Sequence, residues 1–263
     1  MKSKWIAVRY QGKRIGISVL RRETGQKVIL FIHGLGCAKE AFDLAFAAPG
    51  LHKYSLLAAD LVGFGDSSKP ARFTYQMEDQ AGVLKTLLEE IGFETVHIVA
   101  HSMGGAVGLL LSEKIQGSVG SFTNVEGNLV GEDCGLLSRR SAGVSRHDFI
   151  HGVFDEIKGS IGRSCRDEVL TWLEKSDPLA FYRSAVSLLR WSESGRLLEK
   201  FKMLHTRKLY LYGERNRGLC VLDRLGSIPR AEIPDSGHFI MLDNPGRFYR
   251  VIAEHVVGGE TAE

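Results

Sequence analysis

A serine between small residues is the residue of this sequence best placed to do chemistry. Residues 96–107 read VHIVAHSMGGAV, so an apolar run leads into Ser102, with Ala100 two positions before it and Gly104 two positions after it. A nucleophile on a tight strand-to-helix turn has a strained backbone, and small neighbours let the adjoining chain approach. Such a turn would also aim the backbone N–H of Met103 into the space around the hydroxyl. A serine that merely caps a helix is the alternative.

Two other stretches could supply the partners of such a nucleophile. Residues 31–42, FIHGLGCAKEAF, end a predicted strand in a His-Gly pair, and the backbone N–H of Leu35 could donate to an oxyanion. Residues 233–245, IPDSGHFIMLDNP, place His238 after the last predicted strand, from where a general base can reach Ser102. Taken alone, each stretch has an ordinary explanation, a glycine turn for the first and a loop histidine for the second.

Two further polar motifs are assigned structural roles. In residues 60–70, DLVGFGDSSKP, we expect Asp60 and Asp66 to anchor a tight loop at the rim of the site. Residues 147–151, HDFIH, have the histidine spacing of a zinc-peptidase helix, but an aspartate stands where that motif needs a glutamate, and no third ligand is evident. We therefore predict neither a metal nor a cofactor.

The elements that must position these residues are indicated by hydrophobic patterns. Residues 5–20 alternate around a QGK turn and predict a hairpin. The later apolar runs do not alternate, which is typical of strands buried on both faces of a parallel sheet. They lie at residues 28–32, 56–59, 96–100 and 209–212. Residues 76–91 predict a helix that ends at Gly92, and the repetition of strand and helix predicts a doubly wound α/β sheet.

Residues 127–205 interrupt this repetition. Their helix-like patches are residues 149–157, 166–175 and 179–191, and no convincing buried strand occurs among them. We predict a helical lid inserted after the sixth strand, between core segments 1–126 and 206–263. Insertions at this place often cover an active site and control which substrate enters.

Composition narrows the classes of partner. The chain has 263 residues, 44% hydrophobic and 25% charged, which suits one globular domain. Its net charge is +3, and the basic residues are interleaved with acids, which argues against a nucleic-acid partner. We identify no signal peptide, no apolar run of membrane-spanning length and no CxxC pair among the four cysteines. We predict a cytoplasmic protein with reduced thiols, a small-molecule acyl substrate and no membrane partner.

Taken together, these motifs resemble those of the α/β-hydrolase family over nearly the whole chain. The resemblance covers the N-terminal hairpin, HG after the third strand, D-x-x-GFG-x-S after the fourth, the serine turn after the fifth and SGH near the end. Ala100 departs from it by one methyl group, because many members have glycine there. The resemblance implies a mostly parallel sheet with a helical lid, Ser102 as nucleophile and His238 as base. The oxyanion donors would be the backbone N–H groups of Leu35 and Met103.

The acid that orients the histidine is less obvious. Members of the family usually carry an aspartate where this chain has Asn216, which has no charge. Glu214 is charged and close by, but it directly follows Gly213 and could point away from the histidine. Glu126 ends the predicted sixth strand, beside the strand at 208–212, and some family members place their acid there. We predict Glu126 as the triad acid, with Glu214 and Asn216 as the alternatives.

A serine nucleophile indicates acyl chemistry. A hydroxyl forms an acyl-enzyme that water can hydrolyse, whereas an alkyl ether on serine would be a dead end. The dehalogenases and epoxide hydrolases of the family, which use an aspartate nucleophile, are therefore excluded. We predict a carboxylesterase-like serine hydrolase of a small carboxylic ester or related acyl compound. A carbon–carbon bond hydrolase, a lactonase and a non-catalytic ligand receptor on the same fold are the alternatives.

Overall fold

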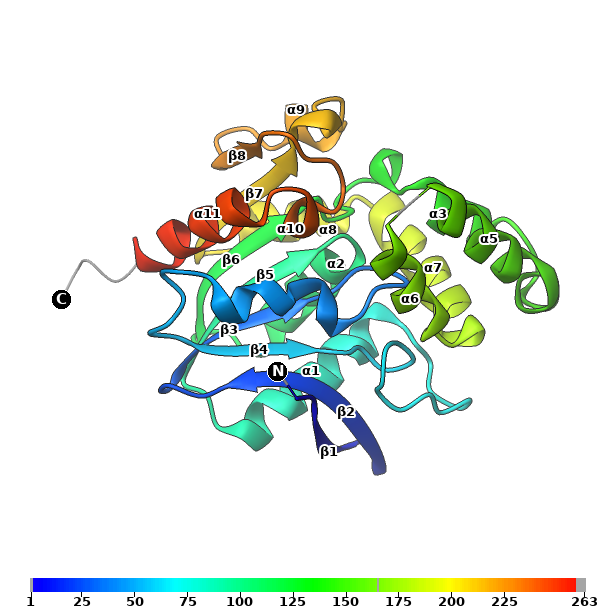
Figure 1. Ribbon diagram of the computed structural model, residues 1–263, viewed down its shortest axis with the longest axis horizontal. Helices are drawn as coiled ribbons and strands as arrows, with labels where there is room; N and C mark the ends of the chain where they lie inside the picture. The colour runs from blue at the N-terminus through cyan, green and yellow to red at the C-terminus, as the bar shows by residue number, and fades with distance from the viewer. Residues whose placement is uncertain (1, 165, 259–263) are drawn as a thin grey trace.

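An eight-stranded sheet lies at the centre of the computed structural model, which describes residues 2–164 and 166–258. Its strands are β1 (Lys4–Tyr10), β2 (Lys13–Arg22), β3 (Lys27–Ile32), β4 (Ser55–Ala59), β5 (Thr95–His101), β6 (Val119–Val125), β7 (Arg207–Gly213) and β8 (Arg230–Ile233). They stand in the order β1-β2-β4-β3-β5-β6-β7-β8, and β2 alone runs against the direction of the other described strands (Figure 1). The predicted doubly wound, mostly parallel α/β sheet is confirmed.

Burial explains why the strand sequences differ. Every residue of β4 is buried, as is every residue but the first of β3 and β5, because helices cover both faces of the sheet there. The edge strand β1 has a mixed pattern and pairs with β2 as a hairpin. The hairpin turns at Gln11 and Gly12, which both have positive φ.

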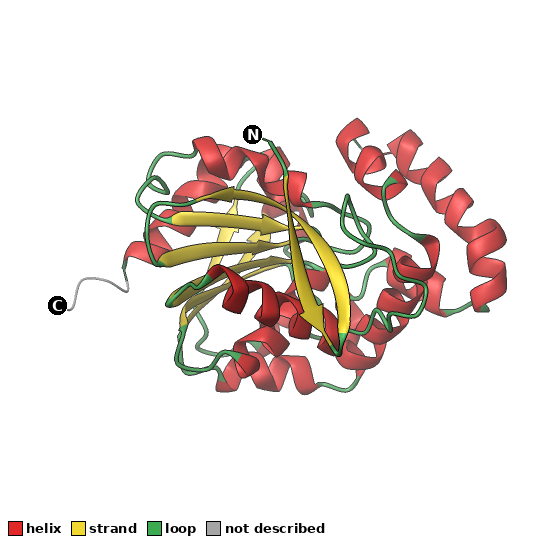
Figure 2. Cartoon of the chain, turned by 90° about the horizontal axis from the view of Figure 1, so that it is seen from below, coloured by secondary structure: helices red, strands yellow, loops and turns green. Residues whose placement is uncertain are grey.

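Helices cover the sheet on both faces (Figure 2). On one face α1 (Met77–Ile91) and α2 (Met103–Lys114) pack beside each other, and on the other lie the 3₁₀ segment η1 (Lys39–Ala47), α10 (Ile240–Asp243) and α11 (Pro245–Val257). Helix α1 ends as predicted, because Gly92 has φ 82° and its N–H donates to Leu88 O. None of the helices in the described ranges is both long and apolar enough to span a bilayer.

Residues 127–205, the helical insert, separate β6 from β7 and hold no strand in the part that the structure describes. Its elements are η2 (Gly131–Asp133), α3 (Leu136–Ala142), α4 (Arg146–Asp148), the π-helical turn η3 (Phe149–Val153), α5 (Phe154–Ser164), α6 (Asp167–Glu174), α7 (Pro178–Glu193) and α8 (Arg196–Met203). Helices α3, α5, α6 and α7 lie together beyond one end of the sheet (Figures 1 and 2). Helix α8 instead returns to the face covered by α2, where Phe201 packs against Phe122 with 5.9 Å between ring centroids.

Candidate active site

Ser102 lies between β5 and α2 in a rare backbone conformation. Its φ of 53° and ψ of −123° fall where L side chains are seldom found. Ser102 N donates to Val125 O at 2.9 Å, and Gly105 N donates to Ser102 O at 2.8 Å, so the turn is tied to β6 and to α2. The hydroxyl therefore stands at the carboxyl end of β5, beside the first residue of α2, Met103, whose N–H has no partner within the helix.

Small residues bring the serine and the loop after β3 together. A Cβ at Gly104 would lie 2.5 Å from Ile32 O, which is a backbone atom of a central strand and cannot move away. A Cβ at Gly34 would lie 3.0 Å from Ser102 Cβ and 3.1 Å from His101 Nδ1. Glycine at both positions lets the two loops approach to van der Waals contact.

His33 holds the loop that carries Leu35. Its buried ring donates from Nδ1 to Gly34 O at 2.8 Å and accepts at Nε2 from Leu61 N at 3.0 Å. This is the pattern of a neutral imidazole, and burial lowers the pKa of His33. In a trans peptide the C=O and N–H point in opposite directions, so fixing Gly34 O turns the N–H of Leu35 away from His33.

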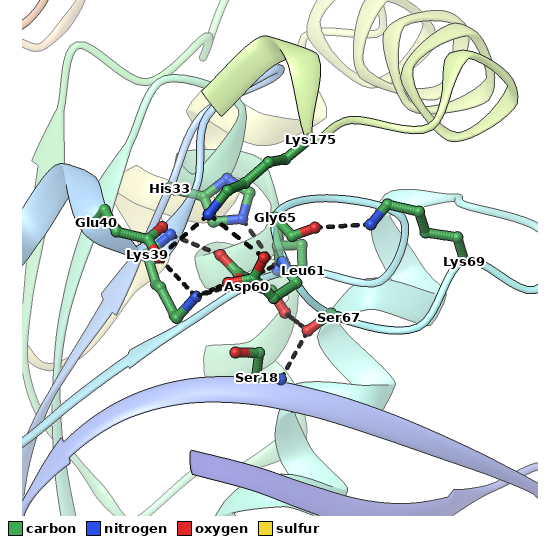
Figure 3. Close-up of polar contacts among 11 residues, drawn as sticks. Ser18, His33, Lys39, Glu40, Asp60, Leu61, Gly65, Ser67, Lys69 and Lys175 are labelled. Atoms are coloured by element: carbon green, nitrogen blue, oxygen red, sulfur yellow. Dashed lines mark hydrogen bonds and ion pairs between the residues drawn. The ribbon is translucent and has the colours of Figure 1, made fainter. Parts of the chain in front are cut away.

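A buried lysine joins this loop to the motif after β4 (Figure 3). Lys39 Nζ donates to Asp60 Oδ2 at 2.9 Å, and both side chains are fully buried. It also donates to Glu40 at 2.8 Å and to Asp66 at 2.9 Å. Burial alone would lower the pKa of Lys39, but the three carboxylates outweigh it and raise that pKa above its ordinary value. Lys175, which follows α6, lies 3.3 Å from Asp66, so the cluster also ties the helical insert to the sheet.

Glu126 and His238 meet where the chain leaves β6 and β8. His238 Nδ1 lies 2.8 Å from Glu126 Oε2, and the glutamate side chain is 2% exposed against 43% for the histidine. Glu126 Oε1 also accepts from Gly213 N at 2.8 Å. Asn216 Nδ2 donates to both carboxylate oxygens, at 2.8 and 2.9 Å. The Glu126 carboxylate accepts a hydrogen bond from Nδ1, so the single N–H of a neutral His238 ring is on Nδ1. Nε2 is then the basic nitrogen.

The other two candidate acids have different partners. Glu214 Oε2 accepts from Asp235 N at 2.9 Å, and its other oxygen lies 3.4 Å from Arg217. Asn216 donates to Glu126 and makes no hydrogen bond to His238 in the described part of the chain. The geometry therefore brings Glu126 to the histidine and engages Glu214 elsewhere.

His101, directly before the serine, is a site residue that sequence analysis missed. His101 is 1% exposed, its Nε2 donates to His238 O at 2.9 Å, and the two ring centroids are 4.7 Å apart. Burial, and next the proximity of His238, lower the pKa of His101 well below its ordinary value. A neutral His101 thus supports the backbone of the loop that carries His238. The one feature of the sequence that could have identified His101 as a site residue is its position directly before Ser102.

Four of the five predicted site residues line a cavity of about 390 Å³, towards the small end of ligand pockets, and Met103 is the one that does not line it. Leu35, Ser102, Glu126 and His238 lie in its wall. Its apolar wall otherwise consists of Leu137, Ile161, Val169, Leu173, Phe181, Leu219 and Phe239. Its polar wall includes Asn128, Asp133, Ser138 and Asn216, and no lysine or arginine of the described chain lines it. A wider surface hollow between α2 and α8 contains none of the predicted site residues.

The paired histidines of the insert lie outside this cavity, whereas one of the cysteines, Cys37, lines it. His147 and His151 have ring centroids 4.5 Å apart, and no group of three His, Cys, Asp or Glu in residues 2–164 and 166–258 could hold a metal ion. Cys37, Cys134 and Cys220 carry free thiols, whereas Cys165 lies outside the described residues.

Comparisons with known proteins agree with this architecture. Residues 29–251 match a family described as the alpha/beta hydrolase family. Lipase 1 of Psychrobacter immobilis is 37% identical over 99 residues, which are 37% of this chain and 31% of that protein. A thermophilic esterase from Thermogutta terrifontis has a TM-score of 0.77 at 18% identity, over 99% of this chain and 100% of its own. An N-acyl homoserine lactonase has a TM-score of 0.77 at 17% identity, over 99% and 98% of the two chains. The match thus spans under a third of this curated lipase and nearly all of both solved structures.

Proposed function

Because the chain belongs to the alpha/beta hydrolase family, we propose that it is a serine hydrolase that cleaves a small carboxylic ester through an acyl-enzyme intermediate. The observation that carries this proposal is the 2.8 Å contact between His238 Nδ1 and Glu126 Oε2, in the cavity that also holds Ser102 on its strained turn. These three groups have the chemistry of a nucleophile, a general base and the acid that orients the base.

In the proposed reaction Ser102 Oγ attacks the ester carbonyl carbon as its proton passes to His238 Nε2. The carboxylate of Glu126 stabilises the imidazolium through Nδ1–H, and the N–H groups of Met103 and Leu35 donate to the oxyanion. His238 then protonates the leaving alkoxide, which departs as an alcohol and leaves the acyl group on the serine. Water, deprotonated by the same nitrogen, attacks this ester and releases the acid and free Ser102.

A ligand receptor explains these features less well. A serine in this φ/ψ region costs about 1–3 kcal/mol, which a binding pocket has no reason to retain. Burying the Glu126 carboxylate is also costly unless donors surround it, and here Gly213, Asn216 and His238 do so. The strained backbone of Ser102 and the buried Glu126 carboxylate, which contacts the exposed side chain of His238, both favour a catalytic site over a binding site.

The proposal is tested by turnover and by covalent labelling. We expect the protein to hydrolyse short-chain p-nitrophenyl esters with burst kinetics, and to be labelled by a fluorophosphonate with one equivalent on Ser102. The label is located by mass spectrometry of peptides. Because a lactone is a cyclic ester, a γ-butyrolactone is assayed in parallel with the open esters. Failure of both labelling and turnover would refute the hydrolase proposal in favour of a receptor.

We further propose that the helical insert acts as a lid that sets acyl-chain preference. Ile161 of α5 lines the cavity and is only partly buried, so Ile161→Ala should lengthen the acyl pocket with little loss of stability. The ratio of kcat/KM for octanoyl over butanoyl p-nitrophenyl esters is expected to rise about tenfold, since one methylene in an apolar pocket contributes roughly 10- to 200-fold.

Val186→Ala is the matched control for Ile161→Ala. Val186 lies on α7 of the same insert, is 39% exposed and does not line the cavity. The chain-length profile of this variant should equal that of the unmodified protein. An unchanged profile in both variants would contradict a role of the insert in selectivity.

A further inference from the structure

We propose that the substrate carries a hydrogen-bond donor, a hydroxyl or an amide N–H, within about four bonds of the scissile carbonyl carbon, and that Asn128 recognises this donor. The inference rests on the proposed function, because it concerns the same cavity and the same serine. It narrows the substrate from small esters in general to those with a donor beside the reacting group.

The orientation of the Asn128 amide is determined by its surroundings. The residue is 6% exposed, lies at the start of the helical insert and lines the cavity. Its Nδ2 donates to Asp133 O at 3.0 Å, and its backbone oxygen accepts from Ser192 Oγ at 2.8 Å. A flipped amide would place Oδ1 against the carbonyl of Asp133, so that two acceptors would face each other. Oδ1 is therefore directed at Ser102.

The only partner of this oxygen among the described residues is the nucleophile itself. Ser102 Oγ donates to Asn128 Oδ1 at 3.4 Å, which is long for a hydrogen bond between oxygens. During attack the serine proton must instead point to His238, and in the acyl-enzyme Ser102 Oγ has no proton. Asn128 Oδ1 then becomes a buried acceptor without a donor, a state that proteins avoid.

A donor on the substrate would satisfy Asn128 Oδ1 at this stage. The reacting carbonyl carbon bonds to Ser102 Oγ, which lies 3.4 Å from Oδ1, so atoms close to that carbon fall within hydrogen-bond reach. The donor could belong to the acyl chain, as in a hydroxyacyl or N-acylaminoacyl ester, or to the leaving alcohol. The absence of lysine and arginine from the described cavity wall favours an uncharged donor-bearing molecule over an anionic one.

Pairs of nearly isosteric esters distinguish a donor on the acyl chain from a donor on the leaving alcohol. Ethyl 3-hydroxybutanoate is compared with ethyl 3-methylbutanoate, N-acetylglycine ethyl ester with ethyl 4-oxopentanoate, and 2-hydroxyethyl butanoate with propyl butanoate. The kcat/KM ratio of each pair is divided by the ratio of its alkaline hydrolysis rates, which removes intrinsic reactivity. At least one pair should favour the donor by about ten- to a hundredfold, the effect of leaving one buried acceptor unpaired.

Variants assign the preference to Asn128. Asn128→Leu removes the acceptor and should bring the corrected ratio to about one. Ser192→Ala removes hydrogen bonds to the backbone oxygens of Asn128 and Leu188 but leaves the Asn128 amide in place, so it should retain the preference. If Asn128→Leu does not fold, Asn128→Ala removes the same acceptor with a smaller side chain and must abolish the preference. Corrected ratios near one for all pairs, with normal ester turnover, would overturn this inference and leave the proposed function standing. No turnover of any ester would overturn both.

Discussion

Replacing Ser102 by alanine is expected to lower kcat for ester hydrolysis by on the order of 10⁶-fold, as loss of the serine does in a serine protease. Covalent labelling by a fluorophosphonate should disappear at the same time, because Ser138, the other hydroxyl-bearing residue that lines the cavity in the described chain, does not lie on the strained turn. The side chain makes one long hydrogen bond, to Asn128, so the variant should fold and melt like the unmodified protein. Rates and labelling are measured on the same preparation, with circular dichroism to verify the fold.

Ser138→Ala is the matched control for Ser102→Ala. Ser138 is a buried serine of α3 that lines the same cavity, but it does not lie on the turn between β5 and α2. Labelling and turnover should survive in this variant. Normal turnover of an aryl ester by Ser102→Ala would show that the nucleophile has been assigned wrongly.

Glu126→Gln is expected to lower turnover by about 10⁴-fold, the effect of losing the acid from a serine protease triad. The amide keeps the shape of the side chain but cannot hold the proton of His238 at Nδ1 or stabilise the imidazolium. The substitution also places an NH₂ group among donors from Gly213 and Asn216, which costs about 1–3 kcal/mol unless Asn216 reverses its amide. The measurement is kcat/KM together with the midpoint of urea unfolding.

The double variant Glu126→Gln with Asn216→Asp tests whether a carboxylate at position 216 can replace the carboxylate of Glu126. Asn216 Nδ2 lies 2.8 Å from the oxygen that contacts His238, so an aspartate at this position places a carboxylate close to the same histidine. We expect it to recover part of the activity lost in the single variant. Glu214→Gln should have a mild effect, because Glu214 binds Asp235 N and not the histidine. Full activity in Glu126→Gln alone would place the acid on another strand.

The sequence by itself was sufficient for the features that depend on consecutive residues. The apolar run of β5, interrupted only by His97, predicts a strand buried on both faces, and the glycine after α1 predicts the end of that helix; both are confirmed. Gly104 beside Ser102 predicts a close approach of backbone, and a Cβ at that position would indeed lie only 2.5 Å from Ile32 O. Such features follow from the sterics of a few adjacent residues, which any fold must respect.

Only the tertiary structure decided which carboxylate meets His238. Glu126 and Glu214 both follow parallel strands that are direct neighbours, β6 and β7, so strand order alone leaves both within reach of the histidine. The distinction comes from side-chain direction, because Glu126, at φ 46°, turns to His238 and Glu214 binds Asp235. These contacts join residues separated by 112 positions in the case of Glu126 and His238, and by 137 in that of His101 and His238. Contacts over such separations are set by how whole elements pack, and no local sequence pattern encodes them.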